Sequence, residues 1–270
     1  MMAQRRDADA QSIPLQPQAE AGIWGRARAG VTTLYPGYFA LVMATGIISN
    51  ALFLEDYRQL SAILFGVNLV AYPLLWLLTV LRMMMAREAV WADLTSPKLV
   101  FAFFTTVAAT DVLGVGMHLR GWDGAATAMW VFALILWFTL IYLSFGVLTF
   151  LNTAHGANVV HGGWLIAIVG TESLVILGAA IAPNLGAQHQ VVLVLVHMFW
   201  GIGLALYGIF VTLFAYRIFF FDVEPEDITP LARNEFICWV EDAKQQKTRE
   251  RRIRRTREEL EEGQRRPCCW

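Results

Sequence analysis

Charged residues are scarce in the middle of this 270-residue chain, and most of its Lys and Arg lie near the two ends. Asp, Glu, Lys and Arg together make up only 16% of the sequence, hydrophobic residues make up 57%, and the mean hydropathy is +0.50. This composition excludes an ordinary soluble globular domain and indicates a polytopic membrane protein. The net charge of −1 points to no nucleic-acid partner.

Cysteine is also scarce, and Cys238, Cys268 and Cys269 all lie in the polar C-terminal part. No C-x-x-C pair occurs, so we expect neither a disulfide framework nor a cysteine-based metal site. P-loop, zincin and nucleophile-elbow motifs are absent, which argues against an enzyme and against ATP-driven transport by this chain. We predict no cofactor, no metal and no catalytic residue. Haem binding by histidines is the alternative, but only His197 lies well inside an apolar run, and no other His lies at matching depth.

Six apolar runs are present, and each is long enough for a transmembrane helix. They lie near residues 34–53, 60–81, 99–117, 126–150, 163–182 and 191–221. The sequence therefore predicts an all-α polytopic membrane protein whose six transmembrane helices form three helical hairpins. We expect three regions: a disordered cytoplasmic arm (1–32), a transmembrane helical domain (33–221) and a charged cytoplasmic tail (222–270).

The basic residues predict the orientation in the membrane. If the N-terminus is cytoplasmic, the outside loops hold only Arg58 and Arg120. The inside segments then hold the basic tail together with Arg5, Arg6, Arg26, Arg28, Arg82, Arg87 and Lys98. Because cytoplasmic loops carry the excess of Lys and Arg, we expect both termini in the cytoplasm and the chain in the plasma (inner) membrane.

A short pattern recurs in the first, third and fifth apolar runs. In each run an aromatic residue is followed seven positions later by a threonine, which follows a small residue. The threonines, Thr45, Thr110 and Thr171, are 65 and 61 residues apart. One helical hairpin therefore repeats three times in parallel orientation, which suggests hairpins arranged around an axis along the membrane normal.

The odd-numbered runs also carry the polar residues near mid-depth, whereas the even-numbered runs look suited to lipid contact or bulk packing. We expect the odd helices to line an inner surface with Thr45, Gly46, Thr110, Asp111, Thr171 and Glu172. Acids inside a membrane usually face a cavity or a partner, which favours this interpretation. The alternative is that the threonine hydroxyls bond their own helix backbone and only pack.

Four segments carry a resemblance to a known family: "PGYFALVMATGIIS", "GGWLIAIVGTESLVILGA", "FWGIGLALYGIF" and "EPEDITP". They resemble the voltage-dependent anion channel family, which includes tellurite-resistance proteins, C4-dicarboxylate and malic acid transporters, sulfite exporters and plant slow anion channels. The resemblance implies a pore of five hairpins with the odd helices inside, a homotrimer, and a gating phenylalanine on a ninth helix. This sequence has six runs, so it resembles a partial version of that pore without the ninth helix. We therefore hypothesise a truncated or frame-shifted member.

The resemblance implies transmembrane transport of small anions such as C4-dicarboxylates or sulfite. The expected partners are the small anion and the lipid bilayer. A charged Glu172 would repel an anion, but desolvation favours the protonated acid. A neutral Glu172 or Asp111 could donate a hydrogen bond to the anion or release a proton in a coupled cycle. The alternative function is a non-transporting fragment or membrane scaffold.

Overall fold

The computed structural model describes residues 30–97, 99–151, 162–220, 251, 253 and 254. Side chains are described for all of these residues except Leu151 and Ile218. All regular structure in this part of the chain is helical, which confirms the all-α prediction. The α-helices are α2 (Ala40–Leu54), α3 (Arg58–Met85), α4 (Arg87–Leu94), α5 (Phe104–His118), α6 (Asp123–Gly146), α7 (Ile166–Ile181) and α8 (His189–Phe220). Short 3₁₀ segments are η1 (Pro36–Phe39), η2 (Val100–Phe103), η5 (Gly162–Leu165) and η6 (Ala182–Gln188), and Val147–Leu151 (η3) is a π-helical turn.

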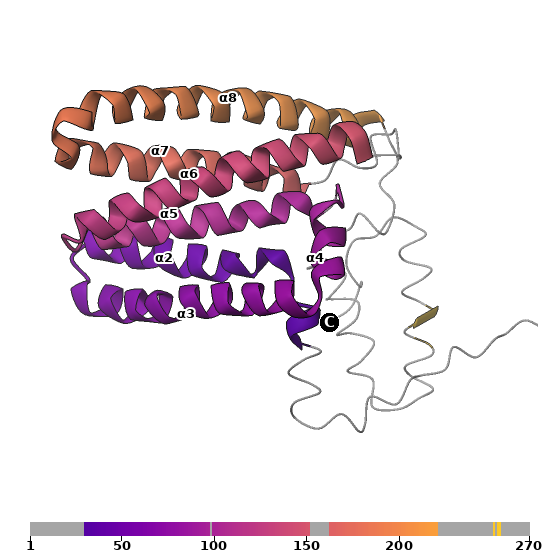
Figure 1. Ribbon diagram of the computed structural model, residues 1–270, viewed down its shortest axis with the longest axis horizontal. Coiled ribbons are helices and arrows are strands. Elements are labelled where there is room, and N and C mark those ends of the chain that lie inside the picture. Colours follow the sequence, from indigo (N-terminus) through magenta and orange to yellow (C-terminus); the bar gives the residue numbers. More distant parts are fainter. Residues whose placement is uncertain (1–29, 98, 152–161, 221–250, 252, 255–270) are drawn as a thin grey trace, which may run out of the picture.

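Five segments are long and apolar enough to cross a membrane. The fifth, Gly162–Arg217, has 56 residues. As one straight helix it would be about 84 Å long, nearly three times the ~30 Å hydrocarbon thickness of a bilayer. The chain instead reverses at η6, so that α7 and α8 lie side by side (Figure 1). The described helices therefore provide six spans, in agreement with the six apolar runs.

The spans form three antiparallel hairpins, α2–α3, α5–α6 and α7–α8 (Figure 1). The first, third and fifth spans begin in the same way, because the 3₁₀ turns η1, η2 and η5 lie directly before α2, α5 and α7. Helix α5 packs against α2 on one side and α7 on the other. This regular arrangement supports the repeat that the threonine spacing indicated.

A residue with positive φ lies in the turn of every hairpin. These residues are Asp56 (φ 61°), Gly121 (φ 79°) and Gly186 (φ 51°). Glycine adopts this left-handed conformation without steric penalty, and Asp is one of the few other residues that tolerates it. The Asp56 carboxylate also pairs with Arg58 at 2.8 Å, although both side chains are largely exposed.

Helix α5 is the centre of the core. Twelve of its 15 residues are buried, including Thr110 and Asp111. Small residues permit this close packing: a Cβ at Gly114 would overlap Leu177 of α7, and one at Gly116 would press on Phe65 of α3. Small residues at helix contacts are the usual way in which membrane helices approach each other closely.

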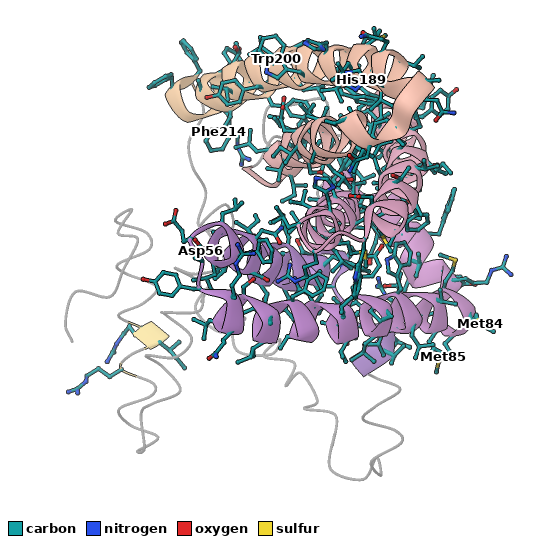
Figure 2. The ribbon with its side chains drawn as sticks, turned by 90° about the vertical axis from the view of Figure 1, so that its left-hand side faces the viewer. Asp56, Met84, Met85, His189, Trp200 and Phe214 are labelled. Atoms are coloured by element: carbon teal, nitrogen blue, oxygen red, sulfur yellow. The ribbon has the colours of Figure 1, made fainter. Side chains whose placement is uncertain are left out.

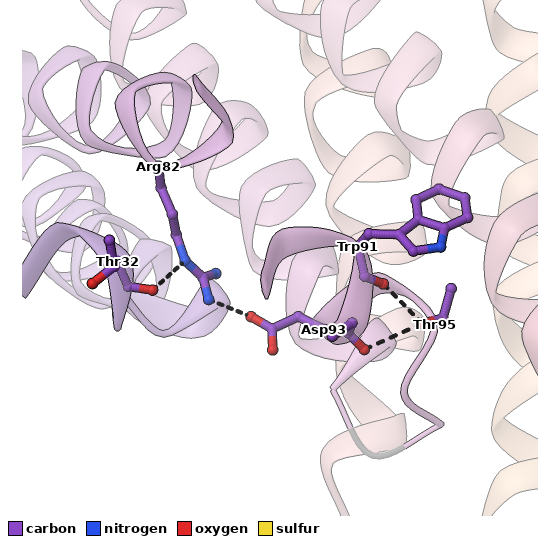
Figure 3. A network of polar contacts seen from close by, with 6 residues as sticks. Thr32, Arg82, Trp91, Asp93 and Thr95 are labelled. Atoms are coloured by element: carbon purple, nitrogen blue, oxygen red, sulfur yellow. Dashed lines mark hydrogen bonds and ion pairs between the residues drawn. The ribbon is translucent and has the colours of Figure 1, made fainter. Parts of the chain in front are cut away.

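The connection between the first two hairpins is fixed by Arg82, near the C-terminal end of α3 (Figure 3). Its guanidinium pairs with Asp93 of α4 at 2.7 Å, and its Nε donates to the Thr32 carbonyl oxygen at 3.1 Å. The Arg82 side chain is 8% exposed and that of Asp93 18%. The nearly buried guanidinium therefore holds α3, α4 and the segment before η1 together through one ion pair and one hydrogen bond.

Candidate functional site

Two of the three repeated threonines connect neighbouring hairpins. Thr110 and Thr171 are fully buried, and their hydroxyls donate to backbone carbonyls one turn earlier in their own helices, at 2.6 and 2.7 Å. Each hydroxyl oxygen also contacts an aromatic group of the preceding hairpin. The Tyr72 hydroxyl of α3 lies 2.8 Å from Thr110 Oγ1, and Trp137 Nε1 of α6 donates to Thr171 Oγ1 at 2.8 Å. Each threonine therefore bonds its own helix and also the second helix of the preceding hairpin.

Thr45 differs from its two counterparts. It lies on α2, the first helix of the first hairpin, and its side chain is only partly buried. No aromatic group of the described residues bonds its hydroxyl, because no hairpin precedes α2 in this part of the chain. Sequence reasoning found the threonines but missed Tyr72 and Trp137. The signal that could have found them is their own spacing of 65 residues, the same as that between Thr45 and Thr110.

Asp111 lies in the contact between α5 and α7. It is fully buried, and its Oδ2 accepts a hydrogen bond from Ser173 Oγ at 2.7 Å. Its Oδ1 has no partner among the described residues. The second oxygen is therefore open to a further hydrogen-bond partner, which a protonated carboxyl group could bind as a donor. Ser173 was also missed from the sequence.

Gly46 and Glu172 are the counterparts of Asp111 in α2 and α7. A Cβ at Gly46 would overlap Val112 of α5 and Asn68 of α3. Glu172 is partly exposed, and its carboxylate lies against Gly203 of α8, where a Cβ would overlap it. Gly46 and Glu172 thus each face the second helix of their own hairpin, and Gly46 and Asp111 each face the first helix of the next hairpin. Of the six predicted residues, Gly46, Thr110, Asp111 and Thr171 are buried between helices, while Thr45 and Glu172 are partly exposed.

Two arginines, Arg58 and Arg120, lie at the end of the bundle that holds the three hairpin turns. Arg120 donates to Ser61 Oγ at 2.7 Å and to the Gly116 carbonyl oxygen at 2.9 Å, and its guanidinium lies 3.9 Å from the ring centre of Phe65. Burial, and secondarily the charge of Arg58, lower the pKa of Arg120 from its usual value. An arginine nevertheless stays charged at neutral pH. Arg120 therefore carries a fixed positive charge at this end of the bundle, where the carboxyl groups of Glu55, Asp56 and Asp123 also lie.

No metal site is evident in the part of the chain that the structure describes. No group of three or more His, Cys, Asp or Glu side chains lies close enough together there to hold an ion. His118 Nδ1 does contact Asp123 Oδ1 at 2.6 Å in the turn between α5 and α6. Two such side chains are too few for a structural metal site, which usually has four ligands.

Two curated relatives come from Methanocaldococcus jannaschii, and both are named uncharacterized transporters. One is 28% identical over 217 residues, covering 74% of this chain and 59% of the relative. The other is 27% identical over 208 residues, covering 72% of this chain and 58% of the relative. The chain thus spans somewhat under three fifths of the length of these relatives. No solved structure matches the chain.

Two family descriptions match the sequence. One, "Bacteriocin-protection, YdeI or OmpD-Associated", matches residues 226–263, nearly all of which lie outside the described residues, and it carries no conclusion about the helical bundle. The other, "Voltage-dependent anion channel", matches residues 33–232 and so covers all the helices of the bundle. The chain belongs to the voltage-dependent anion channel family.

Proposed function

We propose that this chain transports small anions such as C4-dicarboxylates, malate among them, or sulfite across the plasma membrane. The observation that carries the proposal is the family match, because it extends over every described membrane span. We further propose that both termini are cytoplasmic, as the basic residues suggest, and that the working form is a homotrimer. The proposed regions 1–32 and 222–270 lie almost entirely outside the described residues.

The proposed pathway runs along the first helix of each hairpin, α2, α5 and α7. It passes Thr45, Gly46, Thr110, Asp111, Thr171 and Glu172. Hydroxyl groups and exposed backbone can bind an anion without a fixed positive charge at mid-depth. Thr110 and Thr171 are engaged with aromatic groups, so an anion would reach them only after these contacts open.

We propose that the two intramembrane acids couple transport to protons. Asp111 Oδ1 has no hydrogen-bond partner among the described residues, and Glu172 is partly exposed beside α8. In the neutral form either carboxyl can donate a hydrogen bond to an anion, and in the charged form it would repel the anion. Protonation and anion binding would therefore favour each other, which is the requirement for symport.

A flux measurement in proteoliposomes tests the proposal. We expect radiolabelled malate or sulfite to enter vesicles that contain the purified chain faster than empty vesicles, and choline to be excluded. Exclusion of choline shows that the vesicles are intact. One of the longer relatives from Methanocaldococcus jannaschii, reconstituted in parallel, serves as the positive control. If the relative transports an anion and this chain does not, the transport proposal is wrong.

The second candidate, a non-transporting fragment or membrane scaffold, is favoured by the chain's coverage of only 59% and 58% of the two relatives. The same flux measurement separates it from transport. The hypothesis of a truncated or frame-shifted gene is tested by translating all reading frames of the DNA downstream of codon 230. Further apolar runs of about 20 residues in another frame would support it.

A further inference from the structure

The second helices of the three hairpins, α3, α6 and α8, carry a repeat of their own. Each has two aromatic residues seven positions apart, with a leucine four positions after the first. The pairs are Phe65 and Tyr72 on α3, Trp130 and Trp137 on α6, and Trp200 and Tyr207 on α8. Residues seven apart lie on one face of a helix, so each pair forms a single aromatic stripe.

The first two pairs dock the next hairpin. Phe65 and Tyr72 are buried against α5, where Tyr72 contacts Thr110 and Phe65 packs beside Gly116. Trp130 and Trp137 are 4% exposed and bond α7, where Trp130 Nε1 donates to a backbone carbonyl at 2.9 Å and Trp137 Nε1 to the threonine hydroxyl. The aromatic pair is therefore the part of one hairpin that holds the odd helix of the hairpin after it.

The third pair occupies the equivalent position on α8. Independent contacts within the hairpins support this register, because Asn68 of α3 packs against Gly46 just as Gly203 of α8 packs against Glu172. Asn68 lies three residues after Phe65, and Gly203 lies three residues after Trp200. The two aromatic pairs therefore face the same way relative to their own hairpins.

Unlike the others, the third pair is uncovered. Trp200 is 55% exposed and Tyr207 54%, and Figure 2 shows Trp200 pointing out of the bundle. Both lie within about 7 Å of the midpoint of α8 at 1.5 Å rise per residue. Trp and Tyr that contact lipid concentrate at the membrane interfaces rather than at mid-depth. The position of this pair therefore favours a protein partner over lipid.

The matching surface is exposed at the opposite end of the row, on α2. Ile48 is 54% exposed, whereas its counterparts Leu113 of α5 and Leu174 of α7 are buried. Thr45 is likewise partly exposed, whereas Thr110 and Thr171 are fully buried. The face that aromatic pairs cover on α5 and α7 is thus open on α2.

We propose that a second copy of this chain docks its α2 against the exposed aromatic pair of α8. Tyr207 of one copy then contacts Thr45 of the other, as Tyr72 contacts Thr110 within the chain. The two copies insert in the same direction, because all odd helices in the row run parallel. The contact is head-to-tail, joining different surfaces of the two copies. It also shields the partly exposed Glu172 from lipid, and it holds whether or not the chain transports anions.

Cross-linking tests the contact. In a background with Cys238, Cys268 and Cys269 replaced by serine, Thr45→Cys and Tyr207→Cys are placed on two differently tagged copies and co-expressed in one membrane. A Tyr and a Thr in side-chain contact have Cα atoms too far apart for a direct disulfide, so a short bifunctional thiol reagent is used. We expect a cross-linked dimer that carries both tags, and no dimer when either variant is expressed alone.

The control replaces Tyr207→Cys with Tyr142→Cys, an 86% exposed tyrosine on α6. No mixed dimer, or a mixed dimer formed equally well with the control, would overturn the proposal and leave lipid or another polypeptide as the occupant.

A second measurement uses energy transfer between labelled full-length copies diluted in vesicles. Tyr207→Phe and Trp200→Ala should each lower the association constant between copies about tenfold, as expected for lost contacts between membrane helices. Tyr142→Phe should leave it unchanged, and an equal effect of both tyrosine substitutions would contradict the head-to-tail contact.

Discussion

Helices α3 and α5 have similar hydropathy but opposite environments. The most apolar window of the span containing α5 has a mean hydropathy of 1.7 and is 78% buried, whereas that of α3 has a mean hydropathy of 2.0 and is 17% buried. In a membrane, hydropathy cannot separate a core helix from a peripheral one, because lipid is as apolar as a protein interior. Side-chain size and polarity do separate them here: α5 is rich in Gly, Ala and Thr, whereas α3 is rich in Leu, Val and Met.

Enlarging a glycine should have the largest effect and should distinguish the two helices. Gly114→Leu on α5 would drive a side chain into Leu177, so we expect about 3 kcal/mol of destabilisation from overpacking. Gly66→Leu on α3 has open space around it and is the matched control, with an expected change near zero. The measurement is the unfolding free energy in mixed micelles. Equal losses in both variants would mean that the difference in packing is wrong.

The two ends of α3 should respond differently to the loss of an arginine. Arg82→Ala leaves the Asp93 carboxylate largely buried and unpaired, so we expect a loss of about 2 kcal/mol. Arg58→Ala removes an exposed pair with Asp56, whose contribution is at most about 0.5 kcal/mol. Thermal unfolding of both variants at low and high salt measures the difference. A similar shift in Tm for both would contradict the anchoring role of Arg82.

Removing one hydrogen bond between hairpins should have a smaller effect. Tyr72→Phe on α3 retains the ring but removes the hydroxyl that contacts Thr110, so we expect about 1 kcal/mol of destabilisation. Tyr142→Phe on α6 changes an 86% exposed hydroxyl and serves as the control. Unfolding in mixed micelles measures both. If Tyr72→Phe is neutral, the buried Tyr–Thr contact does not stabilise the joint between α3 and α5.

Glu172→Gln should have the smallest effect on stability, because the amide has the same shape and fits against Gly203. Its effect should appear in transport: we expect anion uptake to be retained and its pH dependence to flatten, since the amide cannot take up a proton. Uptake into proteoliposomes between pH 5 and 8 measures this. Glu55→Gln, at the exposed end of α2, is the control. A wild-type pH profile for Glu172→Gln would rule out coupling through this residue.

The sequence predicted the helices more completely than the contacts between them. Six apolar runs and one repeated threonine pattern correctly indicated six spans in three hairpins, because span length and hairpin repeats leave direct marks in the sequence. The aromatic partners of the threonines were missed, since Tyr72 and Trp137 lie in runs that otherwise suit lipid. Contacts such as Asp111 with Ser173 join residues 62 positions apart, and no local pattern encodes such pairings.

The row of hairpins has a consequence for how the protein loses structure. Among the described residues, each hairpin packs chiefly against its immediate neighbours, as in a repeat protein. The free energy of local opening therefore depends on the adjacent contacts rather than on the whole molecule. The middle hairpin, α5–α6, has joints on both sides, while the outer two have one each. Amide exchange should therefore proceed from the two ends inward, with the slowest amides in α5.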